Sequence, residues 1–213
     1  MIPVFLRFDL QSWFPRRQTL LTLLLVVAVG IILPLPGMAI IAAALVTSLM
    51  VSTPFLGDER GRLDTLYGVL PVSRGSIVAG RALSLVVYYL VATTLAVGAT
   101  VAVAAVRGSS ISPSILLLAL AAGAGFVGIS LALQLPVFFR IGYSRGRLMA
   151  YAPTIVIAGG AWVLQATGLH TPLLDIFAPA PTAALVAVGV GIGALGLLIA
   201  LGTSTASYRT REL

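Results

Sequence analysis

The 213-residue sequence contains no cysteine and no lysine, and each absence excludes a class of chemistry. Without cysteine, the chain can form neither a disulfide nor a thiolate metal site. Without lysine, it cannot contain a Walker A loop, because the GxxxxGK[ST] motif uses its lysine to contact the nucleotide phosphates. Any nucleotide that drives this protein must therefore be bound by a partner.

Charge of either sign is also scarce. Only 9% of the residues are charged, 59% are hydrophobic and the mean hydropathy is +1.10. This composition predicts a polytopic membrane protein with a single transmembrane domain over residues 1–213. The apolar segments lack the alternation of barrel strands, and lipid offers the backbone no hydrogen-bond partners, so we expect an all-α protein. The net charge of +7 is explained by topology and anionic lipid, without nucleic acid.

Six apolar segments have roughly the 20 residues that a helix needs to cross the hydrocarbon core. They predict spans at 18–36, 38–56, 80–106, 114–136, 147–168 and 182–203. The proline-rich stretch 33–37 is too short for anything but a tight outer turn. With six spans, twelve arginines lie on one side and Arg107 lies alone on the other. The positive-inside rule then places both termini in the cytoplasm. The expected location is the cell inner (plasma) membrane.

The first seventeen residues have the pattern of an interfacial helix. Apolar residues recur on one side of it, and Trp13 and Phe14 precede a pair of arginines, where aromatic and cationic membrane anchors are expected. The candidate contact residues of this helix are Phe5, Arg7, Trp13, Arg16 and Arg17.

The longest polar interruption, residues 57–81, predicts a short amphipathic helix. Asp58 and Glu59 suit a helix start, Pro71 ends the helix, and Ser73 is a predicted N-cap for the next one. One interpretation is a solvated loop; the other is a helix that docks on a soluble partner. The candidate docking residues are Asp58, Glu59, Arg60, Arg62, Leu63, Asp64, Leu66, Tyr67, Leu70 and Pro71.

Glycines within the spans predict close helix packing. The segment 191–196 matches GxGxxG, but it lies inside an apolar span without a preceding strand, so dinucleotide binding is not expected. Together with Gly123, Gly125 and Gly128, these glycines allow helix backbones to approach one another. Gln134 and Gln165 are expected to form hydrogen bonds between helices.

No set of residues in the sequence suits an active site. His170 has one nearby carboxylate, Asp175, which is too few ligands for a metal, and no hydrolytic set accompanies it. The three prolines in residues 170–181 leave two alternatives open for this segment, an outer loop or a short re-entrant helix.

Two polar segments resemble the ABC-2 type transporter permeases of the small six-span branch. The first is Asp58-Glu59-Arg60 followed by LPVSR at 70–74, IV at 77–78 and GR at 80–81; the second is LPVFFRIGYSRGR at 135–147. Arginine stands where that branch often has lysine, which keeps the charge but not the geometry. The second segment is expected to be a cytoplasmic loop whose candidate residues are Arg140, Gly142, Tyr143, Arg145 and Arg147.

The resemblance implies an N-terminal elbow helix at 3–17 and a coupling helix at about 58–70, within a coupling segment at 57–76. It also implies a second permease copy or a paralogue, and separately encoded ABC ATPase subunits that bind ATP and Mg. The expected function is the permease subunit of an exporter, with no enzyme activity and no cofactor in this chain. An immunity or assembly factor with the same fold is the alternative. A secondary transporter is disfavoured because no acidic residue lies inside a predicted span.

The predicted substrate is hydrophobic or amphipathic, because the spans offer no buried charge that would pair with an ionic compound. The direction of transport and the identity of the second permease subunit stay open at this point.

Overall fold

The computed structural model describes residues 2–33, 35–61, 63, 73–172 and 179–209. Every regular element within these ranges is helical, which confirms the all-α prediction. The elements in chain order are α1 (Ile2–Trp13), α2 (Arg17–Ile32), α3 (Met38–Met50), α4 (Thr53–Gly61), α6 (Arg74–Arg107), α7 (Pro113–Gly146), the 3-10 turn η1 (Arg147–Ala150), α8 (Ala152–Ala166) and α10 (Thr182–Arg209).

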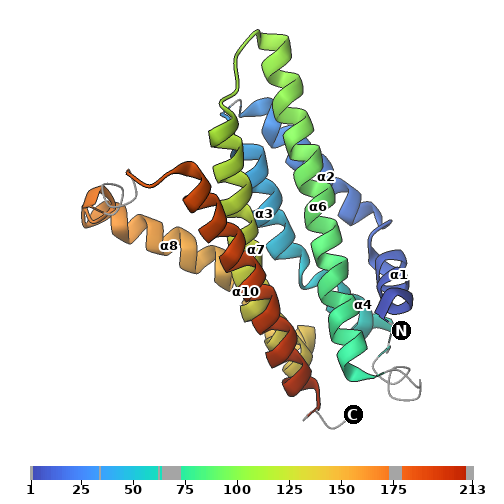
Figure 1. The fold of residues 1–213 in the computed structure, drawn as a ribbon. Helices are drawn as coiled ribbons and strands as arrows, with labels where there is room; N and C mark the ends of the chain where they lie inside the picture. The colour runs from blue at the N-terminus through green and yellow to red at the C-terminus, as the bar shows by residue number, and fades with distance from the viewer. Residues whose placement is uncertain (1, 34, 62, 64–72, 173–178, 210–213) are drawn as a thin grey trace.

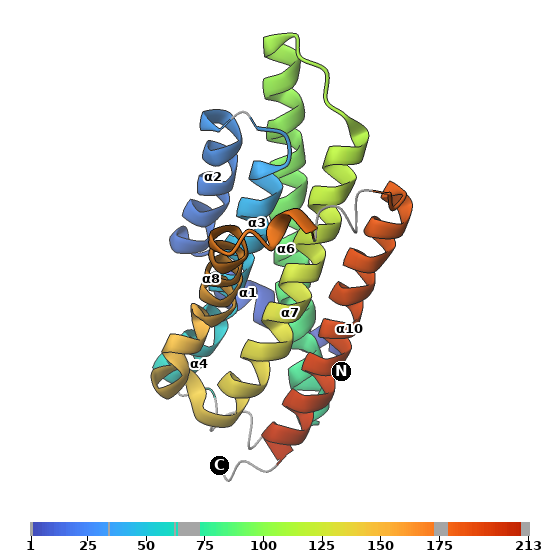
Figure 2. The same ribbon diagram turned by 90° about the vertical axis from the view of Figure 1, so that its left-hand side faces the viewer.

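Figures 1 and 2 show α3, α6, α7 and α10 as the body of an elongated bundle, with α2 along its side. Helices α1 and α4 lie at the end of the bundle that carries both chain termini, and the turns from α2 to α3 and from α6 to α7 lie at the other end. Helix α8 projects from the bundle, and Pro153 is its one buried residue. The fold therefore has one end where several short elements meet, and that end holds the candidate site.

Four helical stretches are long and apolar enough to cross a membrane: Met38–Gly61, Arg74–Arg107, Pro113–Ala166 and Thr182–Tyr208. Helices α1 and α2 are bent by 84° at their junction and would form a fifth span if they are taken as one. The described residues thus contain four or five candidate spans, where the sequence predicted six. The difference arises partly because the predicted fourth and fifth spans fall within one stretch, Pro113–Ala166.

The predicted loop at 135–147 is wrong in its secondary structure. Helix α7 continues through Pro136 as far as Gly146, and its backbone departs from helical angles at Gly142, where φ is 77° and ψ is 179°. Phe138 and Phe139, which follow the proline, are buried. Their packing favours a continued helix although proline removes one backbone donor, and tertiary packing has overridden the local signal.

The glycine prediction is confirmed where α7 meets α10. A Cβ atom placed on Gly196 would lie 2.4 Å from the carbonyl carbon and oxygen of Gly128, and one placed on Gly193 would lie 2.7 Å from the carbonyl oxygen of Ala124. The two backbones therefore touch along this line, which only glycine permits.

Gln134, also on α7, is buried and confirms its predicted role between helices. Its Nε2 donates to Ser48 Oγ on α3 at 3.1 Å and to the Ala150 carbonyl at 3.4 Å. Gln165 is exposed on α8.

Candidate functional site

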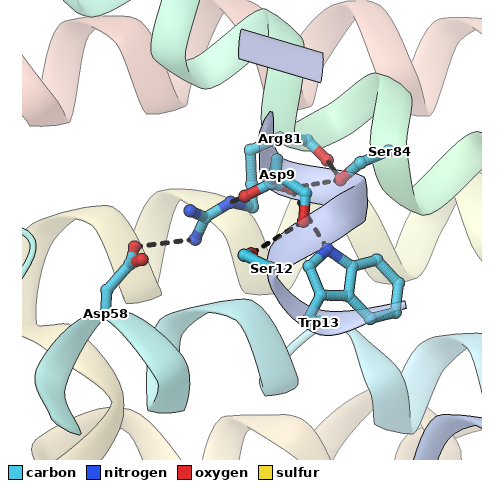
Figure 3. Close-up of polar contacts among 6 residues, drawn as sticks. All are labelled: Asp9, Ser12, Trp13, Asp58, Arg81 and Ser84. Atoms are coloured by element: carbon cyan, nitrogen blue, oxygen red, sulfur yellow. Dashed lines mark hydrogen bonds and ion pairs between the residues drawn. The ribbon is translucent and has the colours of Figure 1, made fainter. Parts of the chain in front are cut away.

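Charged side chains from three helices converge at the end of the bundle that carries the termini (Figure 3). Arg81 of α6 lies between two carboxylates. Its Nε is 2.8 Å from Asp9 Oδ1 of α1, and its Nη1 is 2.9 Å from Asp58 Oδ2 of α4. The Arg81 and Asp9 side chains are each 1% exposed and that of Asp58 is 12% exposed. We call these three residues the Arg81 cluster.

Local sequence explains why Arg81 points inward. Ser73 caps α6, accepting a hydrogen bond from the Ser76 N–H at 3.2 Å, which confirms the predicted N-cap. Ile77, Arg81 and Leu85 then follow at intervals of four residues on the buried face of the helix. The guanidinium also lies over the ring of Phe55, with 4.9 Å from Cζ to the ring centroid.

The buried charges depend on one another. Removing one partner of a buried ion pair typically costs about 3–5 kcal/mol, because it leaves an uncompensated charge away from water. The prediction that the spans offer no buried charge is therefore wrong at Arg81, which lies inside the predicted span 80–106. Both carboxylates contact Arg81, so each charge has a partner within the protein, although two carboxylates and one guanidinium leave one net negative charge when all three are ionised.

Asp9 is held by hydrogen bonds as well as by Arg81. Its Oδ2 accepts from Ser84 Oγ at 2.5 Å and from Trp13 Nε1 at 3.3 Å. Trp13 itself is 1% exposed and packs on Tyr88, with ring centroids 5.6 Å apart. The prediction that Trp13 is an anchor at the membrane interface is therefore wrong, because its N–H bonds to a buried carboxylate and its ring fills space between α1 and α6.

The other candidate residues of the first helix differ in burial. Phe5 is buried against α6, where a Cβ on Gly80 would lie 2.6 Å from the Phe5 ring. Arg7, Arg16 and Arg17 are exposed. The side of α1 that faces the protein consists of Phe5, Asp9 and Trp13, whereas Ile2, Val4 and Phe8 are exposed.

Helix α4, Thr53–Gly61, contains the start of the predicted coupling segment. Asp58 and Glu59 lie near the end of this helix, so the prediction that they open a helix is wrong. Asp58 is buried in the Arg81 cluster, so it does not belong to an exposed charged rim. Arg60 is exposed, and Leu63 is half-buried. The remaining predicted docking residues lie outside the described residues: Arg62, Asp64, Leu66, Tyr67, Leu70 and Pro71.

Glu59 joins α4 to the break in α7. Its Oε1 accepts a hydrogen bond from the Ser144 backbone N–H at 2.9 Å, and its Oε2 accepts from Ser144 Oγ at 2.5 Å. A Cβ on Gly142 would lie 2.6 Å from Glu59 Oε1, and the positive φ of Gly142 also favours glycine. The carboxylate thus satisfies a backbone donor that the break in the helix leaves free. Arg140, Arg145 and Arg147 are exposed nearby, and Tyr143 is half-buried.

Aromatic residues connect α4 to the end of α10. We call Phe55, Phe138, Phe139 and Tyr208 the aromatic layer. Phe55 of α4 packs on Phe138 and Phe139 of α7, with centroids 5.2 and 5.0 Å apart, and Phe139 packs on Tyr208 of α10 at 5.2 Å. Arg74 Nη1 donates to the Tyr208 carbonyl oxygen at 2.8 Å. Helix α4 therefore contacts α1, α6 and α7 directly, and reaches α10 through Phe139.

Sequence reasoning missed Asp9, Ser84 and Ser144. A signal for Asp9 was present, because Phe5, Asp9 and Trp13 recur every four residues on one helix face. An acidic residue on an otherwise apolar face requires a buried partner. Ser84 and Ser144 had no such signal, since serine is unremarkable in a helix or a loop.

Other parts of the described chain contain few groups suited to catalysis or metal binding. No group of three His, Asp or Glu residues within the described ranges could hold a metal ion. His170 is exposed, and Asp175 lies outside the described residues. A cavity of about 370 Å³ lies between α3, α7, α8 and α10, and apolar residues and glycines line it, including Ile41, Phe126 and Ile192.

These features define an integral membrane protein built from apolar helices, with a charged and aromatic layer at one end. The sequence from residue 11 to residue 208 matches the family model of the ABC-2 family transporter proteins, and the chain belongs to this family. No curated protein and no solved structure gives a significant match. The two segments that carried the resemblance, around Asp58 and around Gly142, contact each other in the fold through Glu59.

Proposed function

We propose that this chain is the permease subunit of an ABC exporter and that α4 begins the segment on which a separate ATPase subunit acts. The observation that carries this proposal is the position of α4. It lies at the end of the bundle and contacts α1 through the Arg81 cluster, α7 through Glu59 and α10 through the aromatic layer. A force on α4 would reach most of the bundle because close-packed interiors transmit strain.

The proposal includes the arrangement that the family resemblance implies. The chain crosses the inner (plasma) membrane six times with cytoplasmic termini, α1 is the elbow helix, and a coupling helix follows α4. The permease pairs with a second copy or a paralogue, and the partner ATPase binds ATP and Mg. The bend of 84° between α1 and α2 supports an elbow at this place.

A hydrophobic or amphipathic substrate fits the interior. The cavity between α3, α7, α8 and α10 is lined by apolar residues and glycine, and the buried charges at the end of the bundle are already paired. An ionic substrate would therefore find no free partner among these groups. We expect amphiphiles to stimulate ATP hydrolysis by the reconstituted complex. Stimulation by small polar solutes and by no amphiphile would contradict this substrate class.

Affinity purification from the native host tests the transporter assignment. A stoichiometric ATPase with a Walker A lysine should copurify with the chain. An isolate that contains no ATPase would favour the alternative, an immunity or assembly factor with the same fold. The same purification with Arg60→Glu, which reverses an exposed charge at the end of α4 and leaves the buried Arg81 cluster intact, should retain less ATPase while the chain remains in the membrane.

A further inference from the structure

The two carboxylates that contact Arg81 belong to different elements, and one of them is on the elbow helix. Asp9 lies on α1, and Asp58 lies one turn before the end of α4. We infer that Arg81 is a positioning residue that locks α1 to α4, so that the two move as one unit when the ATPase displaces α4. The lock between α1 and α4 exists in this chain without an ATPase, whereas its part in transport rests on the proposed function.

The geometry of the guanidinium makes this link stiff. Asp9 contacts Nε and Asp58 contacts Nη1, so the two carboxylates approach different nitrogens of one planar group. The fixed fork of a guanidinium sets the directions of both contacts, which a lysine ammonium would not do. The Arg81 and Asp9 side chains are almost fully buried, so salt screens them little. A movement of α4 away from α1 would separate buried charges, and such a movement is therefore opposed.

Hydrogen bonds extend the link beyond α1. Asp9 accepts from Trp13 Nε1, and the Trp13 carbonyl oxygen accepts from Thr19 Oγ1 of α2 at 2.9 Å. The bend between α1 and α2 is thus tied to the same carboxylate. Motion of α4 reaches α7 directly through Glu59 and Phe55, and α3 along the chain itself. A second route leads from the Arg81 cluster through α1 to α2. The second route is absent from any account based on the coupling segment alone.

A distance measurement tests the lock in the chain alone, without an ATPase. The native chain has no cysteine, so spin labels can be placed at two exposed positions, Gln11→Cys on α1 and Arg60→Cys on α4. Asp9→Asn removes the charge with little change of shape. We expect one narrow label-to-label distance in the parent and a distribution at least about twice as wide in Asp9→Asn. An unchanged, narrow distribution in a folded Asp9→Asn protein would overturn the inference.

Matched variants separate a specific lock from general loosening. Arg16→Gln is the control, because the exposed Arg16 guanidinium lies beside Gly57 of α4 but outside the cluster; its distribution should stay narrow. Arg81→Lys retains the charge and loses the fork, so we expect widening; a narrow distribution would show that charge alone suffices and would reject a positioning role. If Asp9→Asn does not fold, Asp58→Asn breaks the same link from the other end and must widen the distribution.

The functional arm uses the complex reconstituted with its ATPase. We expect Asp9→Asn to reduce the amount of substrate transported per ATP hydrolysed by about fivefold or more, whereas Arg16→Gln leaves this ratio within about twofold of the parent. If Asp9→Asn widens the label-to-label distance distribution but leaves the amount of substrate transported per ATP unchanged, the lock does not take part in transport. That result would overturn its role in coupling. If the parent chain retains no ATPase, the proposed function fails, and the distance measurement still decides whether α1 and α4 are locked.

Discussion

Replacing Gly196 with alanine tests the contact between α7 and α10 most directly. The added Cβ would lie 2.4 Å from backbone atoms of Gly128, whereas ordinary van der Waals contact begins at 3.4 Å. The helices must therefore separate locally by 3.4 − 2.4 = 1.0 Å. No side-chain rotation can relieve this clash, because the opposing atoms belong to the backbone. Overpacking of this kind typically costs about 1–3 kcal/mol.

Gly191→Ala is the matched control on the same helix. Nothing lies within 4 Å of a Cβ at this position, so the control has the same change in helix propensity, worth about 0.8–1 kcal/mol in favour of alanine, without a clash. We expect the free energy of unfolding of Gly196→Ala to be about 1–3 kcal/mol lower than that of Gly191→Ala. Equilibrium unfolding in mixed micelles measures this difference.

Gly128→Ala provides a second check, because it pushes the same two backbones apart. The double variant Gly128→Ala/Gly196→Ala should cost less than the sum of the single variants, since one substitution already opens the contact. Equal stability of Gly196→Ala and Gly191→Ala, within about 0.5 kcal/mol, would refute the reasoning. The helices would then be separated in the protein by more than the structure indicates.

Three further predictions concern Gly142, the membrane topology and the coupling segment. Gly142→Ala should lower the unfolding free energy by about 1–3 kcal/mol, because φ of 77° with ψ of 179° is a region that only glycine adopts readily; parental stability would contradict this. A cysteine at Gly61 should resist an impermeant reagent in intact cells, and one at Ser110 should react; the opposite result would invert the topology. Tyr67→Ala should weaken ATPase retention more than Arg62→Ala, because an aromatic hot spot carries roughly 2 kcal/mol and an exposed ion pair about 0–1 kcal/mol; equal retention would reject an apolar anchor.

Patterns with a single physical cause were predicted correctly from the sequence. The apolar composition determined a helical membrane protein. Ser73 caps α6 because a cap depends only on its neighbours. The glycines of α7 and α10 lie at the helix contact because few other roles suit glycine inside a membrane helix.

Predictions failed where distant segments compete with a local signal. Proline at 136 indicated a helix end, but the burial of Phe138 and Phe139 against Phe55 and Tyr208 keeps the helix intact up to Gly142. Trp13 had the position of an interface anchor, yet a carboxylate four residues earlier draws it inward. In both cases packing on a distant helix contributes: Phe138 and Phe139 pack on Phe55 and Tyr208, and Trp13 packs on Tyr88 of α6.

The sequence by itself therefore determined the class of protein, the apolar helices, their caps and the residues at their close contacts, because these follow from composition and from neighbours along the chain. The pairing of charges was decided only by the tertiary structure. Helices α2, α3 and α4 lie between Asp9 and Arg81 in the sequence, yet Asp9 Oδ1 and Arg81 Nε are 2.8 Å apart in the fold. A buried charge requires a partner wherever the chain can supply one, and the packing of α1 and α4 against α6 selects Asp9 and Asp58.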